Sequence, residues 1–373
     1  MKKNFKIITV VGTRPEIIRL SRILYRFDNY FDHVLVNTMQ NYDKKLNNFF
    51  FKDLNIRKPK YNIFHNNKKY LNIIGKNFIE VENIINKEKP DAFFILGDTN
   101  SCLTAYVAKR NKVPIFHYEA GNRCYDENVP EEINRKLIDH IADINLTYSD
   151  NSKYNLLSEG CPKEFILNIG SPMFEVLNHY KNKISNSKIL EKLNLKKNGY
   201  VLISTHREEN LNQKNYIKNL LQFIKKVKNK TKKKVIISTH PRLKKELNSF
   251  KFNDNKSSFI EPLNFTDYNC LQINSYLVFS DSGTINEESS IMGFDAINIR
   301  DNHERHEAME GAVSIMMKID DKNIMQIIDI TKKNKISYQN KINNYFDDNV
   351  SKKIVKTILS YTHKVNKKKY FKN

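Results

Sequence analysis

The stretch FKIITVVGTRPEII, residues 5–18, decides the fold. Phe5–Val11 has the composition of a buried strand, and it ends at Gly12, where a tight turn leads into a helix. Pro15 suits the first position of that helix, because the N–H group that proline lacks has no partner there in any case. A buried strand that runs directly into a helix is the unit from which parallel sheets are built, so this stretch predicts an α/β fold.

Strands and amphipathic helices alternate in the same way along the rest of the chain. Such alternation predicts parallel sheets with helices on both faces. A break at residues 170–172 and a polar, strand-free stretch over 181–198 predict two doubly wound, Rossmann-like domains, residues 1–170 and 171–349, with a C-terminal helix over 350–373 that joins the first domain. The expected strands are 5–11, 33–37, 92–96, 114–118, 144–148, 200–204, 234–238, 259–260 and 277–280; the expected helices are 16–26, 100–110, 131–141, 216–228, one after Pro241, one after Thr284 and 350–361.

Composition excludes several classes of protein. The chain has 373 residues, 40% hydrophobic and 28% charged, as in globular proteins of two or three domains. No apolar run approaches the ~18 residues of a membrane span, so we expect no membrane partner. The four cysteines form no C-x-x-C pair, which argues against a structural zinc site and a disulfide framework and suits a reducing cytoplasm.

The net charge is unusual, because 63 basic residues stand against 41 acidic ones and give +22. A basic field attracts anions, and nucleic acid is the first partner to consider. The excess, however, is mostly lysine spread through the chain, and no zinc finger, RNP-type aromatic motif or heptad accompanies it. We attribute the positive charge to a general bias toward lysine and not to a binding surface, and we expect no nucleic-acid partner.

Two doubly wound domains are expected to face each other across a cleft, with ligands beyond the carboxyl ends of their strands. The turn Asp281–Glu288 follows one such strand. The spacing of Thr284 and Glu287 predicts a capping box, so a helix starts here, with free N–H groups and a dipole that suit a phosphate. Glu288 could accept two hydrogen bonds from a ribose diol. The same sequence is equally expected for a well-capped helix that binds no ligand.

Charged side chains also stand at other turns of this kind. Arg14 lies at the positive end of the first helix, where a purely structural arginine is not favoured, so an anionic ligand is expected there. Asp98, Glu119 and His206 follow strands, and Glu131 opens a helix. Each has an ordinary structural explanation as a cap, a first-turn acid or a buried histidine. Together, at the strand ends of two facing domains, they predict acid–base chemistry.

Three other chemistries find little support. The stretch His303–Glu307 is rich in metal-binding side chains but lacks the H-E-x-x-H spacing that places two histidines on one helical face. No G-x-S-x-G turn is present, and no G-x-G-x-x-G follows the first strand. We therefore expect no metal, no serine or cysteine nucleophile and no tightly held dinucleotide.

Six motifs lie in order between about residues 5 and 330, at residues 12–16, 97–99, 119–121, 130–135, 206–208 and 281–288. In combination they resemble the non-hydrolysing UDP-N-acetylglucosamine 2-epimerases. The resemblance implies a fold like that of GT-B glycosyltransferases, a UDP-linked acetamido sugar as substrate, and neither a metal nor a nicotinamide cofactor. We also expect a homodimer.

The resemblance also implies roles for individual residues. Asp98, Glu119 and Glu131 would be the acid–base carboxylates, and His206 would assist them while it contacts UDP. The cations expected to help bind the sugar and the pyrophosphate are Arg19, Arg135 and Arg305. The residues expected to hold UDP are Arg14, His206, Ser282, Gly283, Thr284 and Glu288.

Finer features resemble one branch, the UDP-N-acetyl-L-fucosamine synthases, over residues 97–103, 121–124, 170–177 and 206–210. The expected reaction converts UDP-2-acetamido-2,6-dideoxy-β-L-talose to UDP-N-acetyl-β-L-fucosamine by elimination and re-addition of UDP, for a capsule or O-antigen polysaccharide. Interconversion of UDP-N-acetylglucosamine and UDP-N-acetylmannosamine is an alternative, and a GT-B glycosyltransferase is a third possibility. Met39 and His306 depart from the usual T-G-Q and E-R-P-E motifs of the family.

Overall fold

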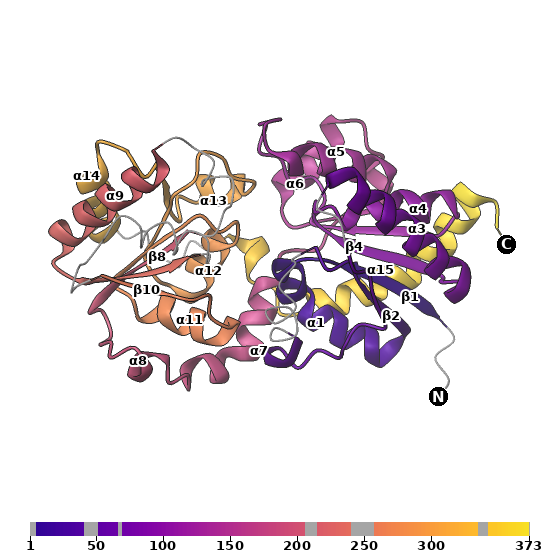
Figure 1. Ribbon diagram of the computed structural model, residues 1–373. Coiled ribbons are helices and arrows are strands. Elements are labelled where there is room, and N and C mark those ends of the chain that lie inside the picture. Colours follow the sequence, from indigo (N-terminus) through magenta and orange to yellow (C-terminus); the bar gives the residue numbers. More distant parts are fainter. Residues whose placement is uncertain are drawn as a thin grey trace. The chain divides into compact units, whose positions relative to one another are not determined.

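The computed structural model describes residues 5–40, 51–65, 69–205, 215–239, 257–334 and 342–372. The chain divides into two compact units, one formed by residues 1–179 and 343–373 and the other by residues 180–342 (Figure 1). Among the described residues, no helix combines the length and the apolar character that crossing a bilayer requires.

The first unit is built on a seven-stranded sheet in which each described pairing is parallel, in the order β3-β2-β1-β4-β5-β6-β7. Its strands are β1 (Lys6–Val11), β2 (Asp32–Asn37), β3 (Tyr61–Asn62), β4 (Ala92–Leu96), β5 (Ile115–Tyr118), β6 (Ile144–Thr147) and β7 (Ile166–Asn168). Its helices are α1 (Arg14–Tyr30), α3 (Tyr70–Glu88), α4 (Ala105–Arg110), α5 (Pro130–Ile141), α6 (Asp150–Ser158), α7 (Met173–Ser185), which contains the boundary between the units, and α15 (Val350–Val365), with short turns at Cys102–Thr104, Lys163–Phe165, Asn343–Tyr345 and Asn366–Tyr370.

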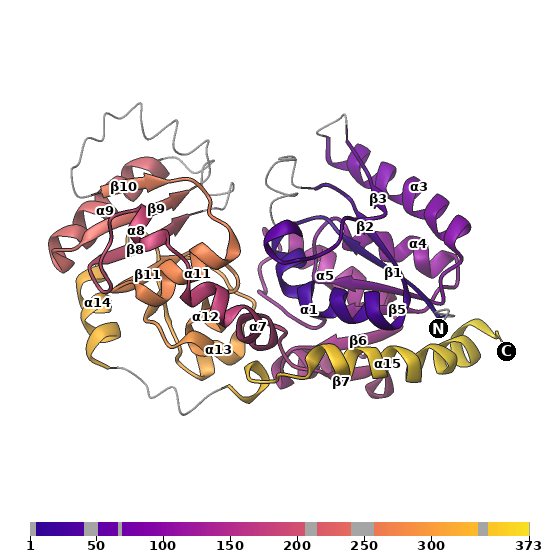
Figure 2. The ribbon, with the colours of Figure 1, turned by 90° about the horizontal axis from the view of Figure 1, so that it is seen from below.

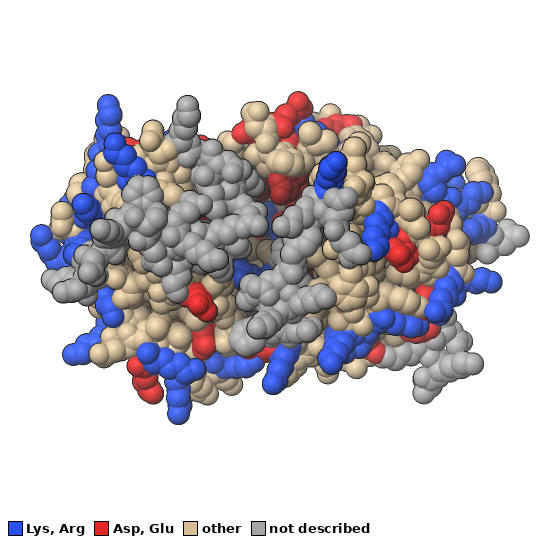
Figure 3. Space-filling view, in the orientation of Figure 1, with Lys and Arg blue, Asp and Glu red and all other residues tan. Residues whose placement is uncertain are grey.

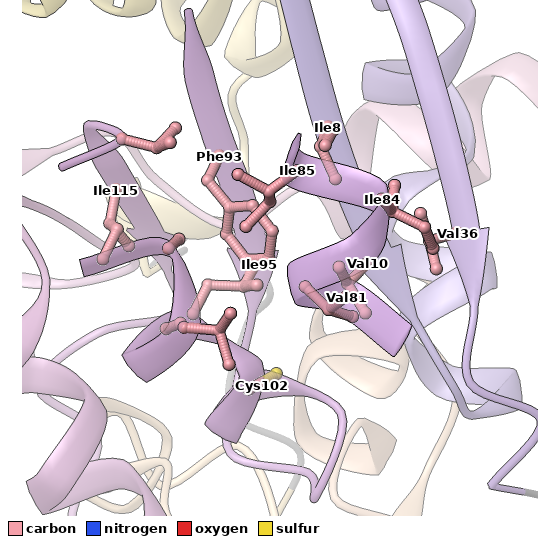
Figure 4. Close-up of a cluster of buried hydrophobic side chains, with 14 of the residues drawn as sticks. Ile8, Val10, Val36, Val81, Ile84, Ile85, Phe93, Ile95, Cys102 and Ile115 are labelled. Atoms are coloured by element: carbon pink, nitrogen blue, oxygen red, sulfur yellow. The ribbon is translucent and has the colours of Figure 1, made fainter. Parts of the chain in front are cut away.

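Helices cover both faces of this sheet. The apolar side chains of α3, α4 and α5 form one buried cluster with alternate residues of β1, β2 and β4, such as Val10, Val36 and Phe93 (Figure 4). On the other face, the ring of Phe27 in α1 meets the ring of Phe94 edge-on at 5.1 Å. The C-terminal helix α15 packs against α1 and so belongs to this unit (Figure 2).

The second unit has a six-stranded parallel sheet in the order β10-β9-β8-β11-β12-β13. Helices α9 and α14 share a core with one face of it, in which the rings of Phe223 and Phe279 meet at 5.1 Å. Its strands are β8 (Tyr200–Thr205), β9 (Lys234–Thr239), β10 (Ser257–Ile260), β11 (Leu277–Ser280), β12 (Ala296–Asn298) and β13 (Ile315–Met316), and its helices are α8 (Ile189–Lys192), α9 (Tyr216–Thr231), α11 (Phe265–Asn274), α12 (Ile285–Met292), α13 (His306–Glu310) and α14 (Ile324–Lys333).

The α/β class with two Rossmann-like units is therefore confirmed. One predicted helix is shorter than expected: residues 100–110 form a 3-10 turn, Cys102–Thr104, before α4. The helix expected after Pro241 falls outside the described residues. In both sheets the direction of strand order reverses once, between β1 and β4 in the first and between β8 and β11 in the second. Because ligands of open parallel sheets bind beyond the carboxyl ends of the strands at such a reversal, these two places are the candidate sites.

Candidate functional site

The turn from β1 to α1 is fixed by one buried carboxylate. Glu16 accepts hydrogen bonds from the backbone N–H groups of Gly12 and Thr13, at 3.0 and 2.6 Å, and from the Thr13 hydroxyl at 2.7 Å. The Thr13 side chain and Glu16 form a capping box, which starts the helix. Thr99, in the turn after β4, also donates to Glu16, at 3.0 Å. Burial raises the pKa of Glu16, although these hydrogen bonds oppose the shift.

Three turns meet at Gly12. A Cβ atom there would lie 1.9 Å from Ser101 Oγ and 2.3 Å from Thr38 Oγ1, two hydroxyls that already share a hydrogen bond of 2.7 Å. No larger residue fits, so glycine is required for the turns after β1, β2 and β4 to pack together. Met39, which replaces the usual glycine of the family motif, follows Thr38 with a left-handed φ of 51°, and its backbone N–H donates to Asn37 Oδ1 at 2.9 Å.

Glu119 lies at the carboxyl end of β5 in a left-handed backbone conformation, with a φ of 71°. Its carboxylate is buried and forms an ion pair with Arg19 of α1. It also accepts a hydrogen bond of 3.3 Å from Asn122. A Cβ atom on Gly97, in the turn after β4, would lie 3.0 Å from Glu119 Oε2. Residues of α1 and of the turns after β4 and β5, which are distant in sequence, thus surround one carboxylate.

Asp98 and Arg135 form a second ion pair at the same edge. The guanidinium of Arg135 donates from Nε and Nη2 to Asp98 Oδ2, at 2.9 and 2.5 Å, and from Nη1 to Glu132 at 2.9 Å. Arg135 is buried, whereas the side chain of Asp98 keeps 24% of its surface exposed. Asn134 donates to the backbone carbonyl of Asp98 at 2.9 Å. Asp98 is therefore held in place yet accessible, as a group that exchanges protons with a ligand must be.

Helix α5 supplies the groups that organise this edge. Glu131, Arg135 and Asp139 are spaced by four residues, so they lie along one side of the helix. Glu131 is half-buried in the first turn of the helix. Burial raises the pKa of Tyr70, and the negative charge of Glu131 raises it further.

Asp139 is a residue of this network that sequence reasoning missed. Its carboxylate lies 2.9 Å from His117 Nδ1 and accepts hydrogen bonds from Arg123 at 2.7 Å and from the N–H of Gly121 at 3.2 Å. Burial alone would raise its pKa, but His117 and Arg123 outweigh that effect and lower it. His117 Nε2 bonds to the carbonyl of Gly97 at 2.8 Å. The spacing of Asp139 from Glu131 and Arg135 is the sequence signal that could have found it.

In the second unit, the turn from β11 to α12 surrounds Glu288 with neutral donors. Thr284 Oγ1 donates to Glu288 Oε1 at 2.7 Å, and Gln272 Nε2 of α11 donates to Oε2 at 2.7 Å. The Ser282 hydroxyl lies 3.1 Å from that of Thr284. A helix starts here as expected, but the predicted capping box is wrong: Thr284 makes no side-chain cap bond, because its hydroxyl is engaged by Glu288.

Glu287, the expected partner in that capping box, instead accepts a hydrogen bond of 3.2 Å from Arg305 Nε. Arg305 is buried, and its backbone N–H donates to the ring of His303, whose pKa is lowered by burial and by His306. Arg300 pairs with Glu304 through two hydrogen bonds of 3.1 and 2.9 Å. Arg300, which sequence reasoning did not single out, lies beside the Gly283 turn.

The strand-reversal points of the two sheets therefore offer different chemistry. The first unit brings Asp98 and Glu119 together with Arg135 and Arg19, and Arg14 is the first residue of α1 at the same edge. The second brings Ser282, Gly283, Thr284 and Glu288 into one turn. His206 directly follows β8 in sequence but lies outside the described residues. Within the described ranges, no group of three or more His, Cys, Asp and Glu side chains is arranged to hold a metal ion.

Two parallel-sheet units of this kind, with charged turns at both reversal points, define a GT-B-like enzyme fold. Residues 25–359 match the pattern that describes the UDP-N-acetylglucosamine 2-epimerase family. The chain belongs to this family, and it is an isomerase, a UDP-sugar 2-epimerase.

Three similar proteins illustrate the range of the family. The structure of a UDP-N-acetylglucosamine 2-epimerase from Rickettsia bellii is 43% identical, covers 99% of this chain and 100% of its own, and superposes with a TM-score of 0.91. The Methanocaldococcus jannaschii UDP-GlcNAc 2-epimerase, in complex with UDP-GlcNAc and UDP, is 32% identical over 96% and 100% of the two chains, with a TM-score of 0.87. A UDP-2,3-diacetamido-2,3-dideoxy-D-glucuronate 2-epimerase from Pseudomonas aeruginosa is 27% identical over 84% and 88%.

Proposed function

We propose that the protein inverts carbon 2 of a UDP-linked acetamido sugar by eliminating UDP and adding it back. The observation that carries the proposal is the pair of ion-paired carboxylates, Asp98 and Glu119, at the strand reversal of the first sheet. Two carboxyl groups held at one edge can remove a proton from one face of a carbon and return it to the other.

The chemistry explains why UDP must leave. The hydrogen on carbon 2 of an acetamido sugar is barely acidic, since no adjacent carbonyl stabilises a carbanion. If the bond between carbon 1 and the UDP oxygen breaks, carbon 1 becomes oxocarbenium-like and the proton on carbon 2 can be removed. The resulting 2-acetamidoglycal then takes up a proton on the opposite face as UDP adds back to carbon 1.

We assign the acid–base steps to Asp98, Glu119 and Glu131, with His206 assisting at the nucleotide. Arg135 orients Asp98, and Arg19 orients Glu119, through the contacts described above. Both arginines, together with Arg305, are also assigned to the sugar and the pyrophosphate, where cations stabilise the departing diphosphate. Arg14, at the amino end of α1, contributes to the same stabilisation.

We assign the nucleotide to the turn of Ser282, Gly283, Thr284 and Glu288. Gly283 supports this assignment, because the protein itself does not require a glycine there. An added Cβ atom would meet its nearest neighbour, Arg300 Nη1, at 3.6 Å, an ordinary contact distance. The bare backbone instead leaves room for a diphosphate to approach the amino end of α12.

For the sugar, we propose UDP-2-acetamido-2,6-dideoxy-β-L-talose as the substrate and UDP-N-acetyl-β-L-fucosamine as the product, destined for a capsule or O-antigen polysaccharide. The support is the resemblance of residues 97–103, 121–124, 170–177 and 206–210 to the branch with that activity. The alternative is UDP-N-acetylglucosamine, which two of the similar proteins carry in their names.

One experiment tests the proposal and separates these substrates. The purified protein is incubated with each nucleotide sugar in D2O, and NMR follows inversion at carbon 2 and deuterium uptake there. We expect inversion with deuterium incorporation for the 2,6-dideoxy-L-talose compound. If only UDP-N-acetylglucosamine is inverted, that sugar and not the L-talose compound is the substrate. Release of UDP in proportion to an added acceptor would indicate a glycosyltransferase. Failure of deuterium to enter carbon 2 of either sugar would refute the mechanism.

We also propose that two copies associate through the outer faces of α3, α4 and α5. These helices are neighbours, and each exposes large apolar side chains: Leu71, Ile79, Tyr106, Ile133 and Leu137, all at least half exposed. Neighbouring exposed apolar side chains are typical of association surfaces. Light scattering after gel filtration should give about twice 44.0 kDa, and Ile79→Glu together with Leu137→Glu should give the monomer mass.

A further inference from the structure

Glu288 has protein hydrogen bonds on both of its carboxylate oxygens. Thr284 donates to Oε1 and Gln272 to Oε2, each at 2.7 Å. Each oxygen of an ionised carboxylate can accept more than one hydrogen bond. The two donors hold the Glu288 carboxylate in one plane and so fix the directions in which it accepts hydrogen bonds.

Gln272 is an unusual donor for this purpose. It is completely buried in α11, and its own Oε1 has no hydrogen-bond partner among the described residues. An amide buried with one side unsatisfied lowers stability, because the oxygen loses its hydration. The orientation of the amide follows from Glu288, which as a carboxylate can only accept, so the NH2 group must face it. The chain therefore keeps a costly side chain whose hydrogen bond goes to Glu288.

We propose that Gln272 is a positioning residue that sets Glu288 for two vicinal hydroxyls, and that it thereby makes the site select ribonucleotides over 2′-deoxyribonucleotides. The inference rests on the proposed function, which places the UDP ribose at Glu288. A carboxylate clamped in one plane can accept from both the 2′- and the 3′-hydroxyl without first losing rotational freedom. When the 2′-hydroxyl is missing, one of the positioned acceptors stays unpaired.

The test compares the binding of UDP and of 2′-deoxy-UDP by calorimetry. The wild-type chain should bind UDP about tenfold or more tightly than 2′-deoxy-UDP, since a hydrogen bond to a charged group is lost. In Gln272→Met, which has a similar length but no donor, UDP affinity should fall about fivefold or more while 2′-deoxy-UDP affinity changes less than about twofold. The ratio of the two affinities should therefore move toward one.

Asn269→Leu is the matched control. Asn269 is also a buried amide of α11, but it donates to the backbone carbonyl of Phe265 at 2.8 Å and not to Glu288. This variant should keep the ratio of the wild type. If Gln272→Met is poorly folded by circular dichroism, Gln272→Asn, which withdraws the amide by one methylene group, is measured instead with the same expected change.

The possible outcomes are distinct. Equal losses for both nucleotides in the Gln272 variant would show a merely structural side chain and overturn the inference, as would an unchanged ratio. A wild-type chain that binds UDP but does not prefer it over 2′-deoxy-UDP would overturn the inference and leave the epimerase proposal standing. A wild-type chain that binds neither nucleotide would overturn the nucleotide assignment itself.

Discussion

At the amino edge of the first sheet, Glu88 is held by Lys60 at 2.6 Å, Lys6 at 3.1 Å and the hydroxyl of Tyr61 at 2.6 Å. At the same edge, Asp143 is paired with Lys109 at 2.6 Å. At the carboxyl edge, the partners of Asp98, Glu119 and Asp139 are instead the arginines 135, 19 and 123.

The difference is informative because arginine is rare here, at 12 of the 63 basic residues. Lysine is a point charge on a flexible stem and suffices to neutralise a carboxylate. Arginine presents a rigid, planar set of donors that also fixes the orientation of its partner. The rarer residue stands beside all three of these carboxylates, where orientation matters for chemistry, whereas Glu88 and Asp143 are neutralised by lysine. Arg57, which pairs with Asp28 at 2.8 Å near the start of β2, is an exception at the amino edge. Elsewhere lysine and arginine are scattered over the visible face of the molecule (Figure 3).

The largest effect should come from neutralising the proposed acid–base groups. Asp98→Asn and Glu119→Gln should each lower turnover by about 10³-fold or more, because proton transfer to and from carbon 2 is lost. UDP affinity should change little, since neither side chain is assigned to the nucleotide. Asp150→Asn is the control, a carboxylate that follows β6 in the same sheet and pairs with Asn168. Turnover is measured by NMR, and near-normal rates in both variants would remove these residues from the mechanism.

The second-largest effect should be the loss of stability caused by Asp139→Asn. The substitution leaves Arg123 and His117 without their buried anion, so the free energy of unfolding should fall by about 3 kcal/mol. Urea unfolding followed by circular dichroism measures the change. Because His117 bonds to Gly97 beside Asp98, residual turnover should also drop by about tenfold even under conditions where the variant is folded. A folded variant with wild-type turnover would separate the network from the site.

A charge-conserving exchange tests the comparison of the two edges directly. Arg135→Lys keeps the charge beside Asp98 but loses the planar fork, and turnover should fall by about tenfold. The reverse exchange at the amino edge, Lys109→Arg, should leave turnover unchanged and the free energy of unfolding within about 0.5 kcal/mol of the wild type. Equal tolerance at both edges would show that arginine has no special role at the carboxyl edge.

The smallest effect concerns acid stability. Burial would raise the pKa of Glu88, but hydrogen bonds from Lys60, Tyr61 and Lys6 outweigh it and lower the pKa to about 2. A carboxylate with a depressed pKa stabilises the fold above its unfolded pKa, about 4.5, and loses that contribution as the pH falls toward 2. Glu88→Gln should therefore be about 1–2 kcal/mol less stable than the wild type near pH 6, and the gap should close as the pH falls to 2. A gap independent of pH would contradict the assignment.

Much of this arrangement could be predicted from sequence. The strand and turn at residues 5–18 predicted the α/β class, and the motif at 281–288 predicted a helix start after a strand. The ion pairs could not be predicted, because Arg19 and Glu119 are 100 residues apart and nothing local shows that they meet. The capping box illustrates the same limit: the spacing at Thr284 was right for one, yet it forms at Thr13 and Glu16 instead.

By itself, the sequence determined the class of fold, the family and the residue types that stand at the strand ends, because hydrophobic periodicity and turn residues act locally. The tertiary structure alone decided which charges meet. The order of strands brings the ends of β1, β4 and β5 to one edge, and α5 then places Arg135 against Asp98 and Asp139 against His117. Pairing of this kind depends on packing between distant segments, and no local preference of the chain encodes it.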